Sequence, residues 1–243
     1  MNSTTAIILA AGKGTRFKSE KPKVLHKFHG KAMLHHVIET VSKANINNIC
    51  LVVGYKKEMV KASCKNYNVS YAIQEQQLGT GHAVVCGLNA LTSSTDHCII
   101  LAGDCPLIRE TTIAELIQTH ITSNAKATLL TAKLDNAGNY GRIIRNKTNQ
   151  ITAIREAKDC SDVELNITEF NSGIYCFDTN ALQDCLKKLN TNNAQNEYYL
   201  TDVIEFFSNE GEIIAGVCID NAWEVSGANT QEELNKMAEV SLN

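Results

Sequence analysis

A glycine-rich loop with three cations around it is the stretch of this sequence best suited to chemistry. The apolar residues 6–9 lead directly into Ala10-Ala11-Gly12-Lys13-Gly14-Thr15-Arg16, and Pro22-Lys23 follows shortly after. Glycines let the backbone approach a bound anion closely, and successive N–H groups can surround phosphate oxygens. Lys13, Arg16 and Lys23 would add positive charge at the same place. A strand that enters such a loop predicts a nucleotide site at the carboxyl edge of an α/β sheet.

The loop matches neither of the two common phosphate-binding fingerprints. The dinucleotide motif G-x-G-x-x-G would need a glycine where Phe17 stands. The P-loop motif G-x-x-x-x-G-K-[ST] is not supplied by Gly12-Lys13-Gly14-Thr15 either. An ordinary strand-to-helix turn is the alternative interpretation of the glycines alone. Arg16 and the Pro22-Lys23 pair favour the phosphate interpretation.

Two other polar segments follow predicted strands. Gly103-Asp104 comes after the apolar residues 98–101, and a carboxylate at this edge is a hard ligand suited to Mg²⁺ beside phosphates. Residues 74–82 read Gln-Glu-Gln-Gln-Leu-Gly-Thr-Gly-His, whose amide side chains could hydrogen-bond the edge of a base. In the alternative interpretation, Asp104 caps the next turn and Thr80 is the N-cap of the helix that follows.

The second half of the chain carries polar groups suited to a sugar. Tyr140-Gly141-Arg142, Glu156 and Asn171-Ser172-Gly173 lie at the ends of predicted strands, where they could bind hydroxyls and an amide. Turn chemistry is the alternative, since Gly and Asn dominate turns for backbone reasons. Asn229 precedes the last predicted helix and is a candidate N-cap.

Composition narrows the class of protein. The 243 residues are 44% hydrophobic and carry a net charge of −3, which favours a sizeable core and argues against a nucleic-acid partner. Nine cysteines show no C-x-x-C pair and no metal-ligand spacing. No signal peptide and no membrane span are predicted, so we expect a reduced, cytoplasmic protein with no membrane partner.

Alternating strands and helices through the first half predict a largely parallel sheet covered on both faces. The expected strands are residues 6–9, 49–53, 70–73, 98–101 and 127–133, and the expected helices 33–44, 56–65, 82–91 and 111–123. Thr111 or Thr112 is the predicted N-cap of the last of these, with Glu115 as a capping-box partner of Thr112. The second half predicts a hairpin at 142–145 and 151–154, strands at 170–177 and 212–218, and helices at 181–189, 198–208 and 231–242. We expect one domain over residues 1–243, with a nucleotide-binding part at about 1–135 and a sugar-binding lobe at about 136–243.

Taken together, the motifs resemble the sugar nucleotidyltransferase (pyrophosphorylase) superfamily. Within it, they are most similar to the N-acetylglucosamine-1-phosphate uridylyltransferases that form the N-terminal half of bacterial GlmU. The resemblance runs along nearly the whole chain. It rests on residues 9–16 and on Pro22-Lys23-Val24-Leu25-His26, Gln77-Leu78-Gly79-Thr80-Gly81-His82-Ala83, Gly103-Asp104-x-Pro106, Tyr140-Gly141-Arg142-Ile143, Glu156-x-Lys158-Asp159, Asn171-Ser172-Gly173-Ile174, Asn193-Ala194-Gln195-x-Glu197-Tyr198-Tyr199 and Glu224-Val225-x-Gly227-x-Asn229.

The resemblance implies a Rossmann-like, mostly parallel sheet flanked by helices, with a smaller β-rich sugar-binding lobe. The implied reaction joins UTP and N-acetylglucosamine 1-phosphate to give UDP-N-acetylglucosamine and pyrophosphate, with Mg²⁺ as cofactor. The implied catalytic residues are Arg16, Lys23 and Asp104, and the implied metal ligands are Asp104 and Asn229. The implied nucleotide contacts are Leu9, Ala10, Ala11, Gly12, Gly14, Thr15, Gln74, Gln77, Gly79, Thr80 and Gly103. The implied sugar contacts are Gly141, Glu156, Asn171, Glu197 and Tyr198.

This chemistry needs no general base, because a sugar phosphate is already a nucleophile at neutral pH. Positioning and electrostatics would carry a direct in-line displacement. A different sugar 1-phosphate or small phosphorylated alcohol as acceptor, and a non-catalytic regulatory protein, are the alternatives. The GlmU family continues into a β-helix of hexapeptide repeats that this sequence lacks, so we expect no acetyltransferase domain. The oligomeric state is left open.

Overall fold

Strands from both halves of the chain join in one nine-stranded sheet. The computed structural model describes residues 3–241. The main path of the sheet runs β11-β7-β10-β6-β1-β4-β5, and β8 and β9 extend it from β10. Its strands are β1 (Thr4–Ala10), β4 (Asn48–Val53), β5 (Ser70–Ile73), β6 (His97–Ala102), β7 (Ala127–Lys133), β8 (Arg142–Arg145), β9 (Ile151–Arg155), β10 (Glu169–Asp178) and β11 (Ile214–Ile219). A short hairpin, β2 (Lys27–Phe28) with β3 (Lys31–Ala32), lies outside the sheet.

The main path of the sheet is parallel at both ends and is interrupted by one antiparallel strand, while β8 and β9 pair antiparallel beside it. β1 pairs in parallel with β4 and β6, and β7 pairs in parallel with β11. β10 inserts between β6 and β7 and is antiparallel to both. The prediction of a mostly parallel α/β sheet is therefore confirmed, and β10 is the strand that joins its two halves.

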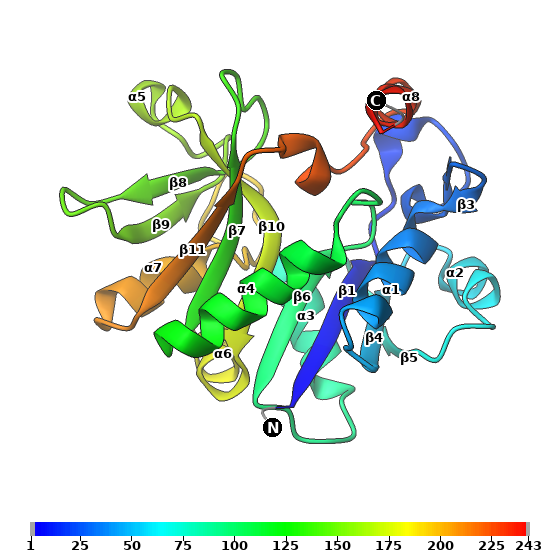
Figure 1. Cartoon of the computed structure of the whole chain (residues 1–243), viewed down its shortest axis with the longest axis horizontal. Helices are drawn as coiled ribbons and strands as arrows, with labels where there is room; N and C mark the ends of the chain where they lie inside the picture. Colours follow the sequence, from blue (N-terminus) through cyan, green and yellow to red (C-terminus); the bar gives the residue numbers. More distant parts are fainter. Residues whose placement is uncertain (1–2, 242–243) are drawn as a thin grey trace.

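Helices cover both faces of the sheet (Figure 1). They are α1 (Met33–Lys43), α2 (Lys57–Ser63), α3 (Thr80–Asn89), α4 (Glu110–Ser123), α5 (Asp162–Leu165), α6 (Thr179–Leu186), α7 (Asp202–Asn209) and α8 (Gln231–Val240), with short 3-10 turns η1 (Thr15–Phe17), η2 (Lys23–Leu25) and η3 (Ala222–Val225). Residues of α1, α2 and α4 share one hydrophobic cluster, and residues of α3, α6 and α7 share another. Successive side chains of a strand point to opposite faces of the sheet, which explains why there are two clusters. Ile8 of β1 belongs to the first cluster and Ile7 to the second.

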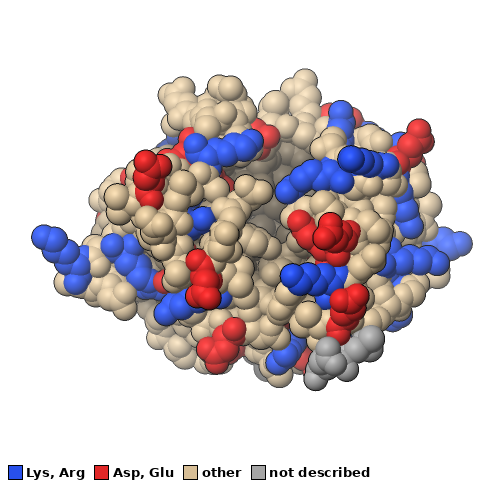
Figure 2. Space-filling model, turned by 90° about the horizontal axis from the view of Figure 1, so that it is seen from above, with Lys and Arg blue, Asp and Glu red and all other residues tan. Residues whose placement is uncertain are grey.

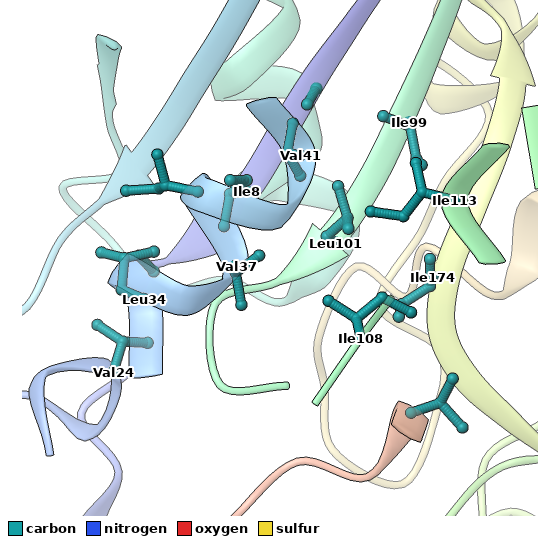
Figure 3. Close-up of a cluster of buried hydrophobic side chains, with 14 of the residues drawn as sticks. Ile8, Val24, Leu34, Val37, Val41, Ile99, Leu101, Ile108, Ile113 and Ile174 are labelled. Atoms are coloured by element: carbon teal, nitrogen blue, oxygen red, sulfur yellow. The ribbon is translucent and has the colours of Figure 1, made fainter. Parts of the chain in front are cut away.

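The first of these clusters holds the strands that lead to the glycine-rich loop. Figure 3 shows Ile8 of β1 and Leu101 of β6 facing Val37 and Val41 of α1. All four side chains are fully buried. Well-packed apolar contacts of this kind fix the ends of β1 and β6, and therefore the loops that follow them.

Seen from above, the surface is hollowed between the two halves of the molecule, and Lys and Arg side chains lie around the hollow (Figure 2). This view faces the end of the molecule toward which β1 runs (Figure 1). The last helix crosses back to the first half, where Leu234 and Met237 of α8 pack with Phe17 and Phe28. α8 is thereby attached to the segment that follows β1.

The predicted N-caps of α4 and α8 were wrong, although α8 begins at Gln231 as predicted. The helices predicted to begin at residues 82 and 181 begin two residues earlier, at Thr80 and Thr179. α4 begins at Glu110 with Arg109 at the N-cap and no side-chain cap, so neither Thr111 nor Thr112 caps it. The predicted helix at residues 198–208 begins only at Asp202, because the backbone before it bonds to another loop. Thr230 rather than Asn229 caps α8, and its hydroxyl accepts from Glu233 N. The residues 242–243 at the end of the predicted last helix lie outside the described residues.

Candidate active site

The glycine-rich loop brings two cations to the carboxyl end of β1. Gly14 has a φ of 63°, in the left-handed region that glycine adopts without strain. A Cβ on Gly14 would overlap the side chain of Lys23, so the absence of one lets the loop fold onto η2. Leu9 O accepts from Gly103 N at 3.0 Å, which holds the end of β6 beside the loop. Ala11 O accepts from Tyr55 N at 3.0 Å on the other side.

Four polar side chains from distant parts of the sequence converge beside this loop. Lys23 Nζ donates to Asn229 Oδ1 at 2.6 Å and forms an ion pair with Asp104. Arg16 Nη2 donates to the same Asn229 oxygen at 2.8 Å. The predicted residues Arg16, Lys23, Asp104 and Asn229 are thus brought together, and a cavity of about 400 Å³ adjoins Arg16 and Asn229.

The first turn of α8 positions Asn229. Asn229 N donates to Glu233 Oε2 at 2.6 Å, while Thr230 Oγ1 accepts from Glu233 N. This reciprocal capping leaves the Asn229 carboxamide free to point at Lys23 rather than cap the helix. Gly227 also allows a close approach, because a Cβ there would lie 2.9 Å from Asp104 Oδ2.

The oxygens of Asp104 and Asn229 are suited to a hard cation. Both contact one ammonium group, so they lie close enough together to share a single positive ion. No group of three or more His, Cys, Asp or Glu side chains within residues 3–241 could hold a metal. An ion at Asp104 and Asn229 would need further oxygens from a substrate or from water, which is the usual way in which proteins bind Mg²⁺.

The predicted base-reading turn is tied to the segment before α7. Gly79 has a φ of 111°, and a Cβ there would lie 2.6 Å from Tyr198 O. Tyr198 N donates to Leu78 O and Gly81 N donates to Tyr198 O, both at 2.8 Å. Thr80 does not cap α3; its hydroxyl accepts from Leu200 N at 3.1 Å. Glu197 and Tyr198, predicted as sugar contacts, are thus brought to the nucleotide side as well.

Gln74 and Gln77 lie between this turn and the glycine-rich loop. Gln74 is buried directly after β5, and Gln77 Nε2 donates to its carbonyl oxygen at 3.1 Å. A Cβ on Gly54 would lie 2.8 Å from Gln77 Nε2 and 3.0 Å from Ala11 Cβ. The close packing at Gly54 therefore joins the predicted base-binding and phosphate-binding segments.

The predicted sugar-side residues gather where β8, β9 and β10 meet. Asn171 N donates to Gly141 O at 2.8 Å, and Asn171 Nδ2 donates to Tyr175 Oη at 2.7 Å. Burial raises the pKa of Glu156, and a hydrogen bond from Thr201 Oγ1 at 3.2 Å partly opposes the rise. No role was predicted for Thr201, which stands two residues after the motif that contains Glu197 and Tyr198.

A cavity of about 310 Å³ is lined by Glu156 and by Asp202, the first residue of α7. Burial, with a contribution from Glu205, raises the pKa of Asp202 to about 6. The folded protein therefore holds the proton of the Asp202 carboxyl more tightly than the unfolded chain does. The stabilisation that this proton gives to the folded state is lost as the pH rises through about 6.

We expect Asp202→Asn to melt at a higher temperature than the wild type at pH 8, and this advantage to shrink as the pH falls below 6. Melting curves across this range check the prediction, and a constant difference would contradict it.

Comparison with known proteins identifies the family. The sequence profile described as nucleotidyl transferase matches residues 5–228. The chain belongs to the nucleotidyl transferase family. Membership confirms the prediction of a nucleotidyltransferase enzyme. None of the helices within residues 3–241 combines the length and hydrophobicity that a membrane crossing requires.

Relatives in this nucleotidyl transferase family confirm the resemblance to GlmU. The bifunctional protein GlmU of Clostridium botulinum is 46% identical over 237 residues, which are 98% of this chain and 51% of that protein. GlmU of Clostridium perfringens is 45% identical over 238 residues, 98% of this chain and 52% of that protein. The chain therefore spans about half the length of these relatives.

Solved structures confirm the fold. A protein assigned as a glucose-1-phosphate thymidylyltransferase from Bacillus anthracis has a TM-score of 0.78 and 19% identity, with 98% of this chain and 95% of that chain covered. A UDP-glucose pyrophosphorylase complexed with UDP-glucose has a TM-score of 0.77 and 16% identity, with 100% and 99% covered. At these identities the similarity concerns the fold alone.

Proposed function

We propose that this chain is a uridylyltransferase that joins UTP and N-acetylglucosamine 1-phosphate and releases pyrophosphate. The observation that carries the proposal is the convergence of Arg16, Lys23, Asp104 and Asn229 beside the glycine-rich loop. Two cations and two hard oxygens at this edge of the sheet suit the handling of two phosphates. The 46% identity to GlmU supports the choice of substrates.

The two substrates would bind to different parts of the chain. We assign the nucleotide to about residues 1–135, with its phosphates on the Gly12–Arg16 loop and its base at Gln74 and the Gly79 turn. We assign the sugar phosphate to about residues 136–243, at Gly141, Glu156 and Asn171. The bonds between the Gly79 turn and Tyr198 connect the two parts and support a single site between them.

The reaction would proceed by direct displacement. An oxygen of the sugar phosphate attacks the α-phosphorus of UTP, and the bond from that phosphorus to the bridging oxygen of the β-phosphate breaks. The electron pair leaves with pyrophosphate, so no covalent enzyme intermediate and no general base are needed. Arg16 and Lys23 would stabilise the charge that develops on the leaving group, and the loop N–H groups would orient the triphosphate.

Mg²⁺ fits this arrangement through the oxygens of Asp104 and Asn229. Bound there, it would offset negative charge on the phosphate oxygens. Lys23 would then exchange its contacts with Asp104 and Asn229 for contacts with phosphate. The fit rests on the two oxygens that already share one ammonium group.

A substrate panel tests the proposal. Pyrophosphate release is measured with Mg²⁺ for UTP against the other nucleotides, and for N-acetylglucosamine 1-phosphate against glucosamine 1-phosphate and glucose 1-phosphate. Release with UTP and the N-acetylated sugar alone is the expected result. Release with another acceptor would keep the chemistry and change the substrate. No release with any pair would favour a non-catalytic regulatory role.

Glu156→Gln should separate binding of the two substrates. The variant keeps an oxygen for the Thr201 hydroxyl but loses the charge that we expect to hold sugar hydroxyls or the amide. We expect the KM for the sugar phosphate to rise about tenfold or more, since a hydrogen bond to a charged group contributes about 1.5–3 kcal/mol. The KM for UTP should change little. Glu210→Gln, at the end of α7 where Glu210 pairs with Lys188, is the control and should alter neither. An equal rise of both KM values would argue against a sugar contact.

A further inference from the structure

The buried amide of Gln74 has both of its N–H groups occupied by the protein. Gln74 is 3% exposed. Its Nε2 donates to Gly79 O at 3.1 Å and lies 3.2 Å from His82 Nδ1. Among residues 3–241, no side chain or backbone group makes a hydrogen bond to the other end of the amide, Oε1. The amide therefore has one atom left for a ligand, and that atom is an acceptor.

The two contacts fix which way the amide faces. A backbone carbonyl can only accept, so the atom of Gln74 that faces Gly79 O is the nitrogen. The second N–H then requires His82 Nδ1 to be unprotonated, which places the ring proton of neutral His82 on Nε2. Nε2 lies 3.8 Å from Cys86 Sγ, one helical turn further along α3. Burial raises the pKa of the Cys86 thiol, so this sulfur is a neutral, weak acceptor for the Nε2 proton.

We propose that His82 is a positioning residue that sets base specificity by holding the Gln74 amide with Oε1 toward the nucleotide. The inference rests on the proposed function and deepens it. An acceptor at this point matches a base with a ring N–H, as uracil has at N3. Cytosine has a lone pair at N3 and would meet the Oε1 lone pairs. Discrimination by a buried polar group left unpaired is stronger than discrimination by shape.

The Gln74–His82 contact is tested by changing the acceptor alone. His82→Leu removes the Nδ1 acceptor and frees the amide to rotate. His82→Asn puts a carboxamide oxygen close to the former position of Nδ1. Kd values for UTP and CTP are measured by calorimetry on the full chain, together with kcat/KM for both nucleotides.

We expect the preference for UTP over CTP to fall about tenfold in His82→Leu, which corresponds to the loss of about one hydrogen bond. His82→Asn should restore most of the preference. The KM for the sugar phosphate should stay unchanged in both variants. A ¹⁵N NMR spectrum of the wild type should show unprotonated Nδ1 and protonated Nε2 for His82.

The outcomes separate the inference from the proposed function. An unchanged UTP-to-CTP ratio in a folded His82→Leu protein would overturn the inference and leave the function standing. An equal loss of affinity for both nucleotides would overturn it too, because that is the mark of a structural role. A protonated Nδ1 would do the same. A wild type that binds neither nucleotide would instead contradict the proposed function.

Discussion

Asp104→Ala will lower kcat by about a thousandfold or more, because it removes the carboxylate of the two proposed metal ligands and the partner of Lys23. The fold should persist. The Asp104 and Lys23 side chains are 12% and 18% exposed, so the lysine that is left can turn toward solvent. Turnover at saturating substrate and the Mg²⁺ concentration for half-maximal rate are the measurements, with circular dichroism to check folding.

A second Asp–Lys pair provides the control for Asp104→Ala. Asp178 Oδ2 lies 3.1 Å from Lys126 Nζ, and Asp178 also caps α6 by accepting a hydrogen bond from Ala181 N. Asp178 stands at the end of β10 that pairs with the start of β6, whereas Asp104 follows the end of β6. Asp178→Ala should lower the melting temperature and leave kcat unchanged. If Asp104→Ala keeps full activity, the metal assignment is wrong. If both variants lose activity in parallel, the effect of Asp104→Ala is one of stability.

Gly79→Ala will destabilise the protein by about 2–4 kcal/mol and weaken UTP binding. Two costs add at this position. The backbone φ of 111° is one that L-residues rarely adopt, and the new Cβ would lie 2.6 Å from Tyr198 O and 2.8 Å from Tyr198 N. The turn must move away from Tyr198, which breaks the two backbone bonds that hold it. Chemical denaturation and the Kd for UTP measure both effects.

Gly211→Ala separates the two costs at Gly79. Gly211 also has a positive φ, 75°, but no atom lies within 4 Å of a Cβ built there. This variant should lose only about 1–2 kcal/mol, the cost of the left-handed conformation, and should bind UTP normally. Equal destabilisation in both variants would mean that the contact with Tyr198 contributes nothing.

The sequence predicted where the strands lie better than it predicted which strands pair in the sheet. Apolar runs located β1, β4 and β6, since a strand buried on both faces has a continuous hydrophobic pattern. The same pattern fits a parallel or an antiparallel strand, so the insertion of β10 between β6 and β7 was not predictable from it. Register and direction depend on contacts between distant segments, which local patterns do not contain.

For the candidate site too, the sequence predicted the residues better than their contacts with one another. Motifs singled out Lys23, Asp104 and Asn229, but the contact between Lys23 and Asn229 depends on how α8 packs against Phe17 and Phe28. Asn229 was expected to cap that helix, and it does not, because its side-chain oxygen binds Lys23 and Arg16. His82 stood in a quoted motif without a role. The available signal was the spacing of His82 and Cys86, which puts both on one face of a helix.

The path of α8 has a consequence for the order in which the protein is made. Asn229 follows Lys23 by 206 residues, yet both belong to one cluster. A ribosome must release nearly all of the described chain before Leu234 and Met237 can pack on Phe17 and complete that cluster. A nascent chain that has already folded β1, β4 and β6 can therefore bury much of its core but still lacks Asn229. Competence for chemistry therefore waits for the synthesis of α8, long after β1, β4 and β6 have been made.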